Sequence, residues 1–108
     1  MAYTTKRYVD KTGHVPYSDW INKLIKKDLR AVARIDARID RASAGNFGDH
    51  KFERDGVWEL RVDYGPGYRV YYALEKNEII LLLVGGDKST QKTDLNLAVK
   101  YLQDYKTR

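Results

Sequence analysis

The segment from Trp58 to Val84 constrains the fold most, because its apolar residues recur with the two-residue period of a half-buried β-strand. Residues 58–64 alternate apolar and polar side chains, and residues 79–84 form the continuous apolar run typical of a central strand. Glycine, proline and asparagine mark the turns between these runs. We expect three antiparallel strands at 58–64, 68–74 and 79–84, with turns at 65–67 and 76–77 and an end at Gly85-Gly86.

The strand period also predicts which side chains share a face of the sheet. If the first hairpin closes on its three-residue loop, Tyr64 lies opposite Tyr68, and the helices cover this apolar face. The same register places Arg69 across from Asp63 and Arg61 across from Tyr71 on the other face. That second face is expected to present five side chains: Glu59, Arg61, Asp63, Arg69 and Tyr71.

The first half of the chain has the 3.6-residue period of helices. A first helix is expected after Ser18 as its N-cap, and Asp28 marks the junction to a second helix that ends at Gly45. Short strands are expected at 3–9 and 51–53, and a C-terminal helix begins near Thr90 or Thr93. The fold class is therefore α+β, with a helical hairpin and a C-terminal helix packed on an antiparallel sheet.

Length and composition indicate one domain over residues 1–108 and exclude several classes of protein. The 108 residues contain no cysteine, which excludes disulfides and thiolate zinc sites. No apolar run approaches the roughly 18–20 residues that span a bilayer, and the first residues lack a secretory signal. We therefore expect a cytoplasmic protein without a membrane segment.

The positive charge lies mainly in the first half of the chain. Residues 1–47 hold ten Lys or Arg against five Asp, which favours an anionic partner such as nucleic acid or an acidic protein. Four arginines fall within one arc of the second expected helix, with no acid three or four residues away: Arg30, Arg34, Arg38 and Arg41. This stripe is either an ordinary solvated face or a surface for an outside anion.

Few residues have the pattern of a reactive site. The sequence has no Walker A loop, GxGxxG or HExxH motif, so no cofactor or metal is expected. His14 and His50 fall in expected loops, and we predict a structural or idle role for each, with an acid/base part for His50 as the alternative. Arg61 and Arg69 have the planar donor fork that suits a phosphodiester, although Arg69 could simply pair with Asp63.

The glycine-rich segment after the third strand is a second candidate for anion contact. Gly85-Gly86 would let a ligand approach the backbone, and Lys88 would then contact a phosphate at the start of the following helix. The alternative for Asp87, Ser89 and Thr90 is helix capping.

Three segments in this order resemble the RelE/HigB-type killer proteins of addiction modules: residues 58–61, 67–72 and 85–91. The similarity extends to the helical hairpin that ends at residues 45–49 and so covers nearly the whole chain. The resemblance implies the toxin of a bacterial type II toxin–antitoxin system, in which a cognate antitoxin, commonly a helix-turn-helix protein, is the partner.

The resemblance also implies a reaction and its residues. RelE-branch relatives cut messenger RNA on the ribosome without a metal, by attack of a 2′-hydroxyl on the adjacent phosphate. Arg69 would contact the phosphate, Arg61 falls close to a basic residue of the preceding strand, and Lys88 lies near the basic residue after the glycine turn. RelE has a tyrosine near the position of Thr93-Asp94, and this chain has none, so Asp87, Tyr71 or another group would move the proton. The alternatives are a ParE-like poison of gyrase and an inactive antitoxin-binding module.

Overall fold

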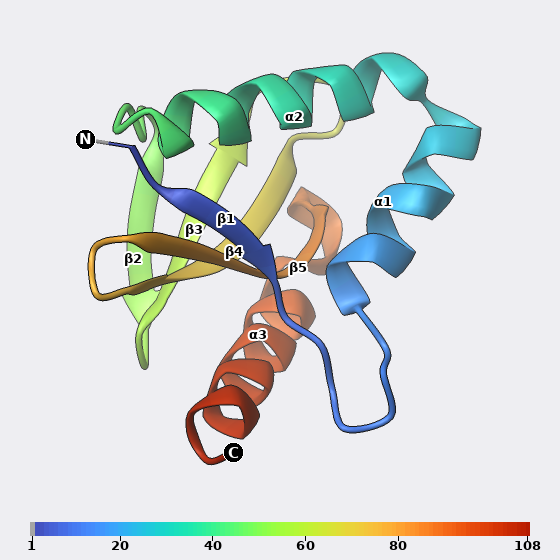
Figure 1. The fold of residues 1–108 in the computed structure, drawn as a ribbon. Coiled ribbons are helices and arrows are strands. Elements are labelled where there is room, and N and C mark those ends of the chain that lie inside the picture. Colours follow the sequence, from blue (N-terminus) through green and yellow to red (C-terminus); the bar gives the residue numbers. More distant parts are fainter. Residues whose placement is uncertain (1) are drawn as a thin grey trace.

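The computed structural model describes residues 2–108, in which helices cover both faces of one five-stranded sheet. The elements follow the expected order: β1 Thr4–Arg7, α1 Pro16–Lys27, α2 Leu29–Ser43, β2 His50–Arg54, β3 Val57–Val62, β4 Tyr68–Glu75, β5 Ile79–Asp87, a 3₁₀ turn Lys88–Thr90 and α3 Gln91–Lys106. Figure 1 shows the α1–α2 hairpin on one side of the sheet and α3 on the other. The predicted α+β class is confirmed.

The strand order is β1-β5-β4-β3-β2, so β4 lies at the centre and β5 has a neighbour on each side. Strands β2 to β5 pair antiparallel, as expected, whereas β1 pairs parallel with β5. The chain reaches β5 from β1 only after the helical hairpin and three other strands, so no turn motif in the sequence marks this pairing. No helix within residues 2–108 has both the length and the apolar character needed to cross a membrane.

The helix junctions follow local capping chemistry. Asp28 caps α2 as predicted, because its Oδ1 accepts a hydrogen bond from the backbone N–H of Ala31 at 3.1 Å. The prediction of Ser18 as the N-cap of α1 is wrong, since the helix already begins at Pro16, whose fixed φ suits a first helical position. The Ser18 hydroxyl instead accepts a hydrogen bond from Nη1 of Arg7 at 2.8 Å.

The register of the β3–β4 hairpin differs by two residues from the predicted one. Val62 pairs with Tyr68, so the connection covers residues 63–67 and is longer than the expected turn at 65–67. Within this connection, the N–H of Gly67 donates to the Tyr64 carbonyl at 3.1 Å. Gly65 and Gly67 both have positive φ, which glycine adopts without strain. A shift of two residues leaves every side chain on its predicted face, since the side-chain period of a strand is two.

Two further expectations are corrected at the sheet's second face. That face is not open, because α3 packs on it and buries Glu59 and Tyr71. Gly85 and Gly86 do not end β5 but lie inside it. A Cβ at Gly85 would fall 2.2 Å from the Trp20 ring, and a Cβ at Gly86 would fall 1.9 Å from Oδ2 of Asp94. The glycines are therefore needed where α1 and α3 approach the sheet most closely.

Candidate functional site

Arg61 on β3 and Arg69 on β4 lie directly opposite each other in the sheet. The predicted pairs, Arg69 with Asp63 and Arg61 with Tyr71, are therefore wrong, because the longer hairpin connection moves the register by two residues. Like charges directly across a strand pair destabilise it. The arrangement requires a negative charge close to both guanidinium groups.

Glu59 supplies that charge from the same face of β3, and its side chain is 0% exposed. Its Oε1 accepts hydrogen bonds from Nη1 of Arg69 at 3.1 Å and from Nε2 of Gln91 at 3.0 Å. Nε of Arg61 lies 3.4 Å from Oε2 in an ion pair. Sequence reasoning placed Glu59 on the polar face and gave it no role. The sequence did hold one indication of that role, because Glu59 stands two residues before Arg61 and therefore on the same face of the strand.

A second carboxyl group, that of Glu53 on β2, lies beside Glu59. Oε2 of Glu53 and Oε2 of Glu59 are both buried and without a hydrogen-bond partner among the described residues. Burial, and next the adjacent Glu59, raise the pKa of the Glu53 carboxyl group. A proton on Glu53 would let its carboxyl group donate to the neighbouring carboxylate.

The structure brings the three predicted site residues, Arg61, Arg69 and Lys88, to the wall of one depression of about 310 Å³. We call it the turn depression, because the glycine-rich turn of residues 65–67 forms part of its wall. Asp49 and Asp63 also line it, and Oδ1 of Asp49 lies 3.5 Å from Nη1 of Arg61. The Arg69 side chain is only 12% exposed, whereas Lys88 is exposed. The depression therefore presents one nearly buried guanidinium, one partly exposed guanidinium and one exposed ammonium.

Neither residue named for proton transfer is free at this depression. Tyr71 is 0% exposed, its hydroxyl donates to the Gln91 carbonyl at 3.3 Å, and burial raises its pKa far above the usual range. Asp87 caps the 3₁₀ turn by accepting from the Ser89 N–H at 2.8 Å, and the Ser89 hydroxyl holds its pKa below the ordinary value. Asp87 therefore has the capping role that the sequence offered as the alternative to phosphate binding or proton transfer.

Asp94 lies where the resemblance places a tyrosine. It accepts a hydrogen bond from Oγ1 of Thr90 at 2.5 Å, and burial raises the pKa of its carboxyl group. Of the carboxylates discussed, Asp49 and Asp63 line the turn depression. Within residues 2–108, no cluster of three or more His, Cys, Asp or Glu side chains has the arrangement of a metal site.

The two histidines differ in their surroundings. His50 stacks between Phe47 and Trp58, with ring centroids 5.2 Å and 4.9 Å away, and its Nδ1 lies 2.8 Å from the Tyr72 hydroxyl. These contacts give His50 a structural role. His14 is exposed and pairs with Asp19 at 2.8 Å. Neither histidine lines the turn depression.

The arginine stripe of α2 is divided by the structure. Arg30, Arg34 and Arg41 are exposed, but Arg38 is 8% exposed and belongs to the protein's interior. Its guanidinium donates to three backbone carbonyls, those of Arg61 at 3.1 Å, Phe47 at 2.9 Å and Asp49 at 2.9 Å. Treating Arg38 as a member of a solvated stripe is therefore wrong, because the 47–49 loop folds over it.

Comparison with known proteins adds two findings to this geometry. Residues 19–106 match the model of the family described as "Phage derived protein Gp49-like (DUF891)". The chain is also 49% identical over 88 residues to an uncharacterized protein of Haemophilus influenzae. That match covers 82% of this chain and 87% of the relative.

Proposed function

Because the chain belongs to the Gp49-like family, a family of the RelE-toxin type, we propose that it is the toxin of a bacterial type II toxin–antitoxin system. Its proposed activity is metal-independent cleavage of messenger RNA on the ribosome, and its proposed partner is a cognate antitoxin of helix-turn-helix type. The observation that carries this proposal is the pair of facing arginines, Arg61 and Arg69, held by one buried carboxylate at the wall of a depression.

The chemistry proceeds from the charges of that depression. Attack of an RNA 2′-hydroxyl on the adjacent phosphate builds negative charge on the phosphate oxygens and expels the 5′-oxygen of the next nucleotide. Arg69 and Arg61 would donate to those oxygens from fixed positions, which lowers the cost of reorganisation in the transition state. Lys88 would add a third positive charge from the rim. The carboxylates of Asp49 and Asp63 line the same depression and are available to accept the 2′-hydroxyl proton and to return it to the leaving 5′-oxygen.

Glu59 has a positioning function in this proposal. Its two contacts leave the remaining N–H donors of Arg69 and Arg61 to face an incoming phosphate. One carboxylate between two guanidinium groups leaves one positive charge, which Asp49 offsets from 3.5 Å away at Arg61. An incoming phosphate would compete with Asp49 for the Arg61 guanidinium.

The test is induced expression in bacteria followed by mapping of messenger RNA ends. Cleavages confined to translated frames support the proposal, and intact transcripts in arrested cells contradict it in favour of a gyrase-type poison. Arg69→Lys keeps the positive charge beside Glu59 but removes the planar fork, and it should abolish cleavage. Arg30→Lys, at an exposed position outside the turn depression, is the matched control and should cleave like the unmodified protein.

Arg69→Ala needs more care as a test of toxicity. Removing one partner of a buried ion pair costs roughly 3–5 kcal/mol, so toxicity lost in this variant would also follow from unfolding. The double variant Arg69→Ala with Glu59→Gln removes both charges and separates the two explanations. A folded double variant that still arrests growth through RNA cleavage would contradict the assigned site.

A further inference from the structure

A second depression of about 250 Å³ lies between α2 and the end of β3, beside the turn depression. We call it the α2 depression. Arg34 and Arg41 line it from the helix, and Tyr64 lines it from the hairpin connection. Asp49 and residues 61–63 line both depressions, so Arg61 stands on the boundary between them. The two hollows therefore form one continuous surface.

The combined surface is strongly basic. Six basic side chains and two acidic ones line it, the basic ones being Arg34, Arg38, Arg41, Arg61, Arg69 and Lys88 and the acidic ones Asp49 and Asp63. The buried Glu59 offsets one further charge of Arg61 and Arg69, and the surface keeps an excess of positive charge. The acids of α2 do not neutralise it, because Asp36 and Asp40 line a separate cavity with Arg7 of β1. Concentrated positive charge along a continuous groove is typical of surfaces that follow a phosphodiester backbone.

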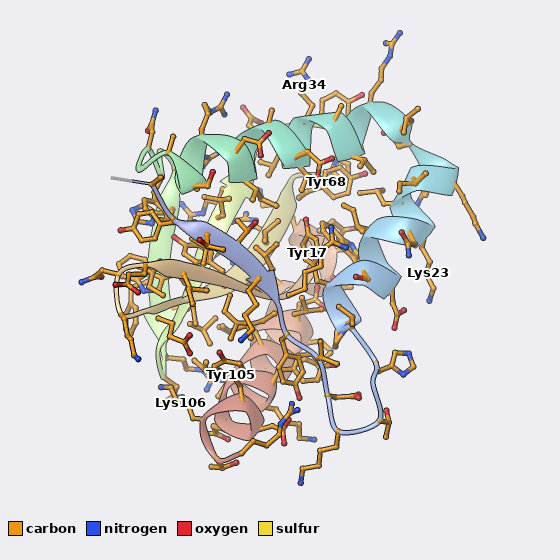
Figure 2. All side chains as sticks on the ribbon, in the orientation of Figure 1. Tyr17, Lys23, Arg34, Tyr68, Tyr105 and Lys106 are labelled. Atoms are coloured by element: carbon orange, nitrogen blue, oxygen red, sulfur yellow. The ribbon has the colours of Figure 1, made fainter. Side chains whose placement is uncertain are left out.

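An aromatic side chain lies within this basic surface. The Tyr64 ring is half-buried, and Cζ of Arg34 lies 5.1 Å from its centroid. Figure 2 shows Arg34 extending outward from α2. The Arg38 guanidinium donates to the backbone carbonyls of Asp49 and Arg61, and so supports the wall that the two depressions share. Aromatic and guanidinium planes together form the usual platform on which an unpaired base stacks.

We propose that Arg34, Arg41 and Tyr64 form a second nucleotide-binding subsite for single-stranded RNA, adjacent to the phosphate held by Arg61 and Arg69. This inference rests on the proposed function, which it deepens by giving the RNA a path. A strand whose reacting phosphate occupies the turn depression crosses Arg61 and places a neighbouring nucleotide in the α2 depression. Arg34 and Arg41 contact its phosphates, and Tyr64 stacks with its base.

The test measures binding without cleavage, so that it stands apart from the proposed reaction. The purified protein is titrated into a fluorescent 2′-O-methyl oligonucleotide, which lacks the attacking hydroxyl, over a series of salt concentrations. Each phosphate contact on a single strand contributes roughly 0.7 to the slope of log K against log salt concentration. Arg34→Ala with Arg41→Ala should therefore make the slope shallower by about 1.4.

The matched control is Lys23→Ala with Arg30→Ala, which removes two exposed positive charges outside both depressions. Figure 2 shows Lys23 on α1, away from Arg34. The control should change the slope by less than half as much. Tyr64→Ala should weaken binding on the order of tenfold, and Tyr64→Phe, which keeps the ring, should bind nearly as tightly as the unmodified protein.

Two results would overturn the subsite. One is a slope for the Arg34/Arg41 double variant equal to that of its control. The other is a poly-glutamate peptide of equal charge that competes as well as RNA, which would assign the surface to an acidic protein. Transcripts that stay intact in cells, with oligonucleotide binding that depends on these residues, would contradict only the proposed cleavage. Cleavage in cells without such dependence would contradict only the subsite.

Discussion

The carboxylate of Glu59 lies between the guanidinium groups of two facing arginines, with Arg69 Nη1 3.1 Å from one oxygen and Arg61 Nε 3.4 Å from the other. The two arginines come from neighbouring strands and would repel each other without it. Gln91, at the start of α3, completes the arrangement by donating to the same carboxylate. The Glu59 carboxylate thus links the sheet to the C-terminal helix and also holds the two arginines of the candidate site.

Glu59→Gln should weaken both the fold and the site. The neutral amide leaves the two guanidinium groups without a counter-charge, and the lost charged hydrogen bond costs roughly 1.5–3 kcal/mol in the free energy of unfolding. Urea denaturation measures this loss. Glu78→Gln, an exposed acid in the turn before β5, is the control and should change stability by less than about 0.5 kcal/mol. Equal stability of the two variants would contradict the role given to Glu59.

Glu53→Gln should have the opposite effect near neutral pH. Because folding raises the pKa of Glu53, the folded state binds its proton more tightly than the unfolded state does. This carboxyl group therefore favours folding as the pH falls through its raised pKa, and opposes folding above it. The glutamine, which resembles the protonated acid, should raise the urea midpoint at pH 7 and reduce the gain in stability on acidification. A midpoint lowered by the substitution would contradict this sign.

Arg38→Lys should destabilise the protein although the charge is kept. An ammonium group cannot reach the three carbonyls that the guanidinium now satisfies, and two orphaned carbonyls cost roughly 2–6 kcal/mol. Arg30→Lys on the exposed side of the same helix should change little. Thermal unfolding of both variants, together with hydrogen exchange in the 47–49 loop, measures the difference. Normal protection in that loop would show that Arg38 does not hold it.

Gly86→Ala should be strongly destabilising, and a second substitution should relieve it. The added methyl group would overlap Asp94, whose Oδ2 lies 1.9 Å and whose Cγ lies 2.8 Å from the ideal Cβ position. Gly86→Ala with Asp94→Ala removes both atoms and should recover much of the lost stability in urea denaturation. Additive losses in the double variant would place the strain elsewhere, for example at Thr90, whose Oγ1 lies 3.0 Å from the same point.

The sequence predicted element order and sheet faces well, because these depend on local periodicity. The alternation from Trp58 to Val62 identified β3 and its buried side, and the apolar run of residues 79–84 identified β5 as a central strand. The hairpin register was wrong because the Gly65-Pro66-Gly67 connection admits more than one loop length, and periodicity cannot distinguish registers that differ by two. The pairing of β1 with β5 depends on distant contacts and left no local pattern.

For the site, too, the sequence showed which residue types are present but not the contacts that depend on the fold. Arg61, Arg69 and Lys88 were predicted together as site residues, and all three line one depression. Glu59 and Arg38 were misjudged because the sequence shows charge but not burial, and both are charged side chains that the folded chain encloses. Only the packing of α3 and of the 47–49 loop reveals what those charges bind.

The most direct test of the proposed activity uses purified protein and ribosomes paused on a defined messenger RNA. We predict cleavage within the codon of the ribosomal A site, leaving a 2′,3′-cyclic phosphate and a 5′-hydroxyl as attack by the 2′-hydroxyl requires. Arg69→Lys should leave the message intact, and Arg30→Lys should cut it. An uncut message with active, folded protein, or cleavage that persists in Arg69→Lys, would contradict the account.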